Sequence, residues 1–114
     1  MDCIFCKIAN GEIPADVVYE DDEVLAFRDL DPQAPVHVLV IPKEHIASLD
    51  DVDESAGHSE LLGRLMSKIH VIASDLGLEN GYRVINNCGE DALQTVKHVH
   101  FHLLGCRKMG WPPG

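Results

Sequence analysis

Residues 98–105 alternate histidines with apolar side chains, and this pattern constrains the fold more than any other part of the chain. Side chains of a β-strand point to opposite faces with a period of two, so the alternation is typical of a strand. The apolar positions are Val99, Phe101 and Leu103, and the histidines are His98, His100 and His102. We therefore predict a strand over residues 98–105, with its apolar side chains in the core and all three imidazoles on the other face.

The three histidines also indicate a reaction site, because imidazole has the unperturbed pKa nearest neutrality. Same-face residues on a strand lie about 6.5–7 Å apart, which separates His98 from His102 by about 13 Å. One metal ion can hold two adjacent rings at this spacing but not all three, so distinct roles are favoured. The middle ring, His100, is the natural nucleophile, provided that its other nitrogen donates its proton to a fixed acceptor. A chance run of surface histidines is the alternative.

The remaining pattern predicts an α+β fold with a mostly antiparallel sheet. A short helical segment is expected over residues 3–12, strands over 17–19, 24–27, 36–41 and 82–86, and a polar loop over 87–94. The first two strands are close enough to form a hairpin, and the apolar run 36–41 is typical of a strand buried on both faces.

One long helix is expected over residues 54–76, because apolar residues recur there at spacings of three or four. The stripe consists of Leu61, Leu65, Ile69, Ile72 and Leu76, joined by Leu62, Met66 and Ala73. Gly77 is well placed to end the helix. His58 and His70 fall in this region, where a surface position is the safer interpretation.

Length and charge narrow the class of protein. With 114 residues the chain forms one domain, 1–114, that can bury a core without disulfides. A formal net charge of -10 argues against sequence-independent binding to nucleic acid, which needs basic side chains. No run approaches the roughly 18 apolar residues of a membrane span, and no signal peptide is evident. We expect a cytoplasmic protein whose four cysteines stay reduced.

Cys3 and Cys6 form a Cys-x-x-Cys motif. The pair can be half of a zinc site, a redox pair or two small buried side chains, and the redox interpretation is weak outside a βαβ pattern. A zinc site needs two more ligands, for which His45 and His98 are candidates if their strands are neighbours. The other cysteines, Cys88 and Cys106, have no motif partner and are interpreted as ordinary thiols.

Several polar residues near strand ends have both a structural and a functional interpretation. Gln94 and Thr95 stand just before the histidine strand, and their amide and hydroxyl groups can contact phosphate oxygens. His37 is by default a hydrogen-bonded core histidine. Asp29 is by default a turn residue, with ribose binding as the sharper option, and Asn87 is a turn residue with Asn80 and Asn86 as nearby alternatives.

The segment from Gln94 to Leu104 matches the signature His-φ-His-φ-His-φ-φ with its preceding glutamine. The chain resembles the histidine triad (HIT) superfamily, specifically its Hint-like branch of purine nucleoside phosphoramidases. Further matching blocks lie at residues 4–8, 12–14, 19–22, 32–35, 40–43 and 111–114. The resemblance therefore spans nearly the whole chain.

This resemblance implies a hydrolase that cleaves the P–N bond of purine nucleoside phosphoramidates, such as AMP-amine or lysine-linked AMP. It also implies a homodimer whose two five-stranded sheets form ten strands. His100 would form the nucleotidyl intermediate. The implied catalytic set is His100, His102, His98, Thr95 and His37, and the implied substrate contacts are Asp29, Leu30, Asn87, Gln94, Thr95, Val96, His100 and His102. Cys3, Cys6, His45 and His98 match the set that binds structural Zn²⁺ in some members. The resemblance implies that catalysis requires no cofactor.

The chain departs from the family pattern in the loop over residues 87–94, which the resemblance places beside the phosphate and which we call the phosphate loop. Ala92 and Leu93 stand where many relatives have small glycines, Thr95 replaces a common serine, and Cys106 replaces a common glycine. A leucine at position 93 can crowd the loop or change which leaving group fits. These departures favour one alternative to the phosphoramidase, a nucleotide-binding or protein-interaction module with little turnover. A weaker alternative is a metal-dependent hydrolase that uses the histidines as ligands.

Overall fold

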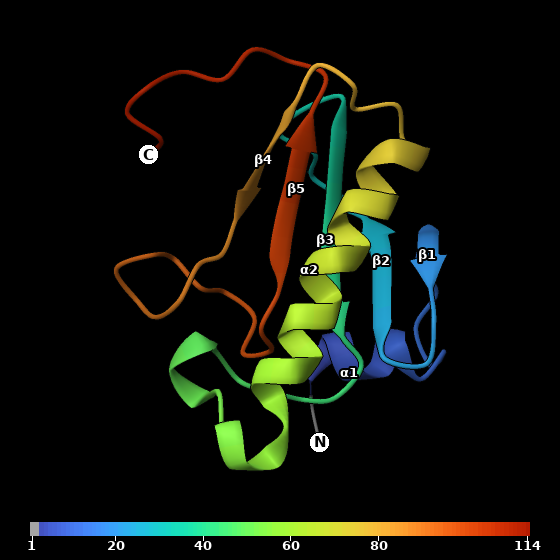
Figure 1. The fold of residues 1–114 in the computed structure, drawn as a ribbon, viewed down its shortest axis with the longest axis vertical. Helices are drawn as coiled ribbons and strands as arrows, with labels where there is room; N and C mark the ends of the chain where they lie inside the picture. The colour runs from blue at the N-terminus through green and yellow to red at the C-terminus, as the bar shows by residue number, and fades with distance from the viewer. Residues whose placement is uncertain (1–2) are drawn as a thin grey trace.

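The computed structural model describes residues 3–114, so the first two residues of the predicted domain lie outside the described part. Its helices and strands are α1 (Ile4–Ala9), β1 (Val17–Glu20), β2 (Val24–Arg28), β3 (Val36–Pro42), α2 (His58–Asp75), β4 (Tyr82–Ile85) and β5 (Phe101–Gly105). Two single 3-10 turns, Leu49–Asp51 and Glu54–Ala56, precede α2. The predicted α+β class, with one long helix and one short N-terminal helix, is confirmed (Figure 1).

The five strands form one sheet in the order β1-β2-β3-β5-β4, and every neighbouring pair is antiparallel. The predicted β1–β2 hairpin is confirmed, and Asp21 organises its turn by accepting the N–H groups of Glu23 and Val24 at 2.8 Å each. The central strand β3 is buried at all seven positions, as its apolar run predicts. The sheet therefore brings β3 and the histidine segment side by side.

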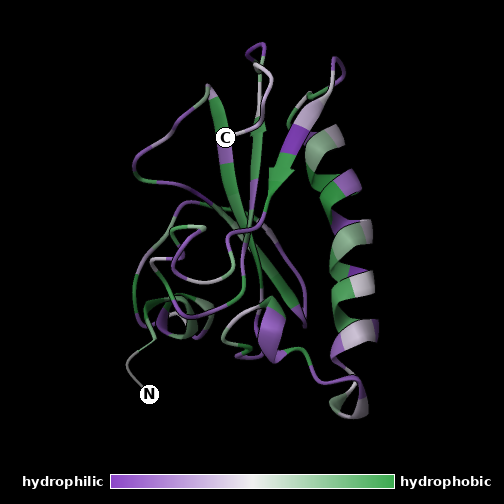
Figure 2. Ribbon diagram, turned by 90° about the vertical axis from the view of Figure 1, so that its left-hand side faces the viewer, coloured by the Kyte–Doolittle hydropathy of each residue, from purple (hydrophilic) through white to green (hydrophobic). Residues whose placement is uncertain are grey.

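The two faces of the sheet have different coverings. Helix α2 packs on one face, and α1 lies on the other (Figure 2). In β3 the residues Val36, Val38 and Val40 face α2, whereas Leu39 and Ile41 face α1. This alternation follows directly from the period of two in a strand.

Helix α2 is shorter than predicted. It begins at His58, because the left-handed Gly57, with φ 78°, separates it from the 3-10 turn that Asp53 caps. The predicted apolar stripe buries Leu61, Leu65, Ile69, Ile72 and Ala73. Met66 was wrongly included, since 42% of it is exposed. Gly77 follows the helix with φ 74°, a left-handed conformation that suits a glycine.

The histidine strand is also shorter than predicted, because β5 begins at Phe101, whereas His98 lies in a bend and His100 precedes the strand. The β3–β5 register would place Pro42 opposite Val99, and proline has no N–H to continue the ladder. The Val99 N–H instead bonds to the Ile46 carbonyl at 2.6 Å. Nevertheless Val99, Phe101 and Leu103 all enter the core cluster under α2, so the predicted division between faces is confirmed.

No helix within residues 3–114 is both long enough and apolar enough to cross a membrane.

Candidate active site and metal site

The α1 face of the sheet gathers three histidines, His37, His100 and His102, into a histidine row. His102 pairs with Leu39 in the neighbouring strand, and His37 pairs with Leu104. Since these positions share a face, the His37 and His102 rings approach to 5.1 Å between centroids, and the His100 and His102 rings to 5.2 Å. The structure therefore brings together His37, His100 and His102 from segments 65 residues apart in sequence.

His100 is oriented by the backbone of its own segment. Its Nδ1 lies 2.7 Å from the His98 carbonyl oxygen. A carbonyl can only accept a hydrogen bond, so Nδ1 carries the proton and Nε2 keeps its lone pair. The ring is 4% exposed and packs edge-on against Phe5, with centroids 5.0 Å apart. This is the arrangement that an imidazole nucleophile needs, with one nitrogen held and the other available.

His102 is held in the opposite tautomer. The Gln33 N–H donates to His37 Nδ1 at 3.0 Å, which leaves the His37 proton on Nε2. That Nε2–H donates to His102 Nδ1 at 2.9 Å. The proton of neutral His102 therefore rests on its Nε2. Two histidines separated by one residue thus differ in chemistry, because His100 offers a lone pair and His102 offers an N–H.

Burial keeps these rings neutral. Burial, together with the nearby His100 and His37 rings, lowers the pKa of His102 to about 4. Burial also lowers the pKa of His37, against the opposing charges of Asp29 and Asp31. At pH 7 both rings are uncharged, so His102 is a hydrogen-bond donor rather than an acid of matched strength.

Asp29 connects the histidines to an apolar cavity. Its Oδ2 lies 3.4 Å from His37 Nε2, and its Oδ1 accepts the Asp31 N–H at 2.8 Å in a local turn. Asp29 therefore acts as a turn residue, and His37 has polar contacts, as their default interpretations expect. The cavity has a volume of about 210 Å³. The residues that line the apolar cavity are Ile4, Phe5, Ile8, Ile13, Pro14, Ala15, Asp16, Phe27, Arg28, Asp29, Leu30 and Leu39. Leu30 lies at its rim and is fully exposed.

The loop before the histidines contains the other predicted contacts. Gln94 is buried, and its side-chain amide is already used, because it accepts the Gly89 N–H and donates to the Ala47 and Val96 carbonyls. The Gln94 amide therefore shapes the loop, and the expected contact between Gln94 and phosphate stays a prediction. Thr95 is exposed, and Asn87 is partly buried. Val96 packs against the α1-side core cluster.

Three residues of this site were missed from the sequence. Phe5 is the single buried residue of α1, and Gln33 sets the His37 tautomer through a backbone group that no side-chain pattern reveals. Asn86, weighed only as an alternative to Asn87, donates its amide to the His100 carbonyl at 2.8 Å. The buried Oδ1 of Asn86 has no hydrogen-bond partner within residues 3–114. A buried amide beside the histidine segment is a signal only once the fold is known.

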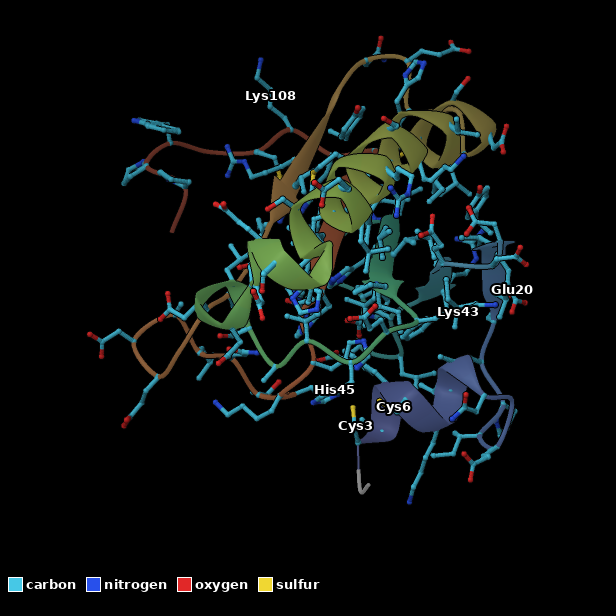
Figure 3. All side chains as sticks on the ribbon, turned by 60° about the horizontal axis from the view of Figure 1, so that its bottom comes forward. Cys3, Cys6, Glu20, Lys43, His45 and Lys108 are labelled. Atoms are coloured by element: carbon cyan, nitrogen blue, oxygen red, sulfur yellow. The ribbon has the colours of Figure 1, made fainter. Side chains whose placement is uncertain are left out.

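The Cys-x-x-Cys motif meets both predicted histidines. Cys3, Cys6, His45 and His98 form the thiol–histidine cluster, in which one ligand atom from each residue lies within 4.8 Å of the others. Figure 3 labels the first three of these residues. The nitrogens of His45 and His98 are 3.2 Å apart, and sulfur–nitrogen distances run from 3.3 to 3.5 Å. His98 Nε2 donates to the Pro42 carbonyl at 2.8 Å, so its Nδ1 lone pair faces the cluster.

This donor set fits zinc. Two thiolates and two imidazoles are a common tetrahedral set, and bonds of about 2.0–2.3 Å place such ligand atoms about 3.3–3.8 Å apart. The carbonyl that holds the far nitrogen of His98 is the outer hydrogen bond usual for a metal-bound histidine. The cluster can therefore hold a structural Zn²⁺, which would cross-link α1 to the segments following β3 and preceding β5.

A second group of ligand types is less suited to a metal. Asp29, His37 and His102 also lie within 4.8 Å of one another. Here, however, the Gln33 N–H occupies His37 Nδ1 and forces a proton onto the nitrogen that would face the ion. This group is therefore a hydrogen-bonded network, which disfavours the metal-dependent hydrolase.

Comparison with known proteins agrees with this geometry. The profile of the family described as HIT domain matches residues 10–109. The chain belongs to the HIT domain family. A HIT family hydrolase from Legionella pneumophila Philadelphia 1 has the same fold, with a TM-score of 0.94, 53% identity, and coverage of 99% of this chain and 100% of that one.

Two relatives in plants bear on the two halves of the site. A 14 kDa zinc-binding protein of Zea mays is 52% identical over 97% of this chain and 87% of its own length. The adenylylsulfatase HINT1 of Arabidopsis thaliana is 48% identical over 97% of this chain and 76% of its own length. The first relative is named for zinc and the second for hydrolysis of an adenylyl compound.

Proposed function

We propose that this HIT protein is a nucleotide hydrolase that cleaves the P–N bond of purine nucleoside phosphoramidates through a nucleotidyl intermediate on His100. The observation that carries the proposal is the 2.7 Å contact between His100 Nδ1 and the His98 carbonyl, because it leaves Nε2 as a nucleophile. The neutral imidazole is reactive toward phosphorus, and the phosphoryl-imidazole that results is labile to water.

The nucleoside would occupy the apolar cavity. Its lining offers aromatic and aliphatic side chains to a purine, and Asp29 offers a carboxylate oxygen to the ribose hydroxyls. The phosphate would then lie beside the histidine row, because Asp29 is 3.4 Å from His37. An anionic substrate approaches a chain of net charge -10, so its phosphate needs local N–H donors such as His102 Nε2–H.

The reaction proceeds by two displacements at phosphorus. His100 Nε2 attacks the α-phosphorus, the P–N bond breaks, and its electron pair leaves with the amine, which takes a proton from solvent. His102 donates a hydrogen bond to a phosphoryl oxygen without losing its proton, as its low pKa requires. Water then attacks the phosphorus and gives up a proton to solvent, the bond to His100 breaks, and its electron pair returns to Nε2. Thr95, which is exposed just before the histidine segment, would contact the leaving group.

We also propose that the protein is a homodimer joined at β4. This strand is an edge of the sheet, and Tyr82 and Val84 on it are 43% and 39% exposed. An unpaired edge with apolar side chains is suited to pairing with a second copy, which would give ten strands. Light scattering after gel filtration should give a dimer mass, and Val84→Lys should give a monomer.

The thiols of the cluster fit the reducing cytoplasm, where we place the protein.

Trapping the intermediate tests the proposed reaction. Adenosine 5'-phosphoramidate is mixed with the protein, quenched in acid-free denaturant within one turnover, and digested for mass spectrometry. We expect AMP on His100 and free AMP in solution, with neither formed by His100→Asn. Adenylylsulfate serves as a comparison substrate, because the same nucleotidyl step would serve either leaving group. Rapid AMP release without any adduct would remove His100 from its role.

The second candidate is a nucleotide-binding module with little turnover. Leu93 supports it, because this residue has φ 61° in the phosphate loop and is 75% exposed where many relatives have a small residue. Calorimetric binding of AMP by a chain that hydrolyses neither substrate would favour the module over the enzyme.

A further inference from the structure

We propose that metal binding at the thiol–histidine cluster and nucleotide binding in the apolar cavity are energetically coupled through α1, with Phe5 as the positioning residue between them. This inference rests on the proposed nucleotide site. It adds a regulatory link between two sites whose residues do not overlap, because no member of the thiol–histidine cluster lines the cavity.

Helix α1 contacts the rest of the fold through its apolar side chains and through the thiols at its N-terminal end. It has six residues, too few to be stable alone, and Phe5 is its single buried side chain. Ile8 and Ala9 are partly buried and pack against the same core cluster as Phe5, and the thiols of Cys3 and Cys6 meet His45 and His98 at 3.3–3.5 Å. A metal ion on these four residues would convert weak contacts into bonds and fix the helix against the sheet.

The same helix forms one wall of the cavity. Ile4, Phe5 and Ile8 contribute to its lining, and two of these residues lie between or beside the cysteines. The position of α1 therefore sets the width of the space that a purine would fill. The thiols and the cavity wall belong to the same short helix. If one ligand orders this helix, the other ligand therefore binds more tightly.

Phe5 also reaches the nucleophile. Its ring meets the rings of His100 at 5.0 Å, Phe27 at 5.6 Å and His98 at 6.0 Å between centroids, all near perpendicular. It thus touches a cavity residue, a cluster ligand and the proposed nucleophile. A second path runs through His98, whose side chain belongs to the cluster and whose carbonyl holds His100 Nδ1.

Coupling between two ligands is reciprocal, which gives a direct test. AMP is titrated into zinc-loaded and chelator-stripped protein by calorimetry, and zinc affinity is measured against a chromophoric chelator with and without AMP. We expect AMP to bind about tenfold more tightly to the zinc-loaded form, and AMP to raise zinc affinity by the same factor. Equal AMP affinity in both forms overturns the coupling but leaves the nucleotide site intact. No AMP binding to either form overturns the nucleotide site and the coupling with it.

Cobalt-substituted protein gives a second test that does not depend on whether the stripped chain stays folded. Saturating AMP should shift the thiolate-to-cobalt absorption bands, because AMP would move the helix that holds the thiols. In Phe5→Leu the cobalt spectrum should remain and the shift should be lost. Ile69→Val, a core change in α2 on the opposite face, is the matched control and should keep the shift. A spectrum unchanged by saturating AMP, or an equal shift in Phe5→Leu, would contradict the proposal.

Discussion

The two faces of the sheet use the same strands for different purposes. The α2 face is filled with aliphatic and aromatic side chains from β2, β3, β5 and the helix, as in an ordinary core. The α1 face holds a smaller apolar cluster together with four buried or half-buried histidines. Since adjacent residues of one strand serve opposite faces, the chain separates stability from chemistry without separating them in sequence. Changes on the two faces should therefore have separable effects.

The largest effect is expected from His100→Asn. We expect kcat for adenosine 5'-phosphoramidate to fall at least about 10³-fold, which corresponds to about 4 kcal/mol of barrier, because the nucleophile is gone. AMP affinity and thermal unfolding should change little, since the amide can keep a hydrogen bond to the His98 carbonyl. Steady-state kinetics and calorimetry on one preparation measure both. A kcat above a tenth of the wild-type value would show that His100 is not the nucleophile and that the α1 face does not carry the chemistry in this way.

Leu65→Ala tests the opposite face. Leu65 is fully buried between α2 and the sheet, and its truncation should lower the free energy of unfolding by about 3 kcal/mol. Urea unfolding measures this loss. AMP affinity, determined at low temperature where the variant is folded, should stay within twofold of wild type. A large loss of AMP affinity would show that the two faces are mechanically linked.

The His102 pKa predicts a dependence of stability on pH. The folded pKa of about 4 lies below the ordinary value of 6.5, so between these values the unfolded chain binds a proton that the folded chain does not. Stability from this group is full above about pH 6.5 and declines by about 1 kcal/mol per pH unit as the pH falls toward 4. The pKa of His37 is also lowered by burial, so its contribution to stability declines in the same direction as the pH falls.

The control for this effect is His102→Asn. Unfolding free energies of both proteins are compared from pH 7 to pH 4.5, and the difference between the two slopes isolates His102. Parallel curves would show that His102 is not held neutral by its surroundings.

Leu93→Gly should have the smallest effect. The left-handed conformation at φ 61° disfavours a leucine, and the exposed side chain contributes little burial. Glycine should relieve this strain and raise the free energy of unfolding by about 0.5 kcal/mol, after its larger backbone entropy is counted. Thermal unfolding measures the change, and Ala92→Gly, one residue earlier in the same turn, is the control. Destabilisation by Leu93→Gly would indicate that the leucine side chain contacts another protein chain.

The predictable parts of the fold were those with strong periodicity. The apolar stripe of α2, the buried run of β3 and the alternation at 98–105 each placed their side chains on the correct faces. The boundaries were less predictable, because Gly57 divides a continuous helical pattern and Pro42 ends the ladder beside Val99. Both depend on backbone conformation or on a partner strand, which a local pattern does not contain.

By itself the sequence determined which residue types were available and how they divide between faces: three alternating histidines, two cysteines at helical spacing and enough apolar residues for one core. Only the tertiary structure decided what each histidine can do. The tautomers of His98, His100 and His102 follow from the Pro42 carbonyl, the His98 carbonyl and His37, whose own proton is placed by the Gln33 N–H. A ring nitrogen takes its role from its hydrogen-bond partner, and three of these four partners are backbone groups that only folding brings into position.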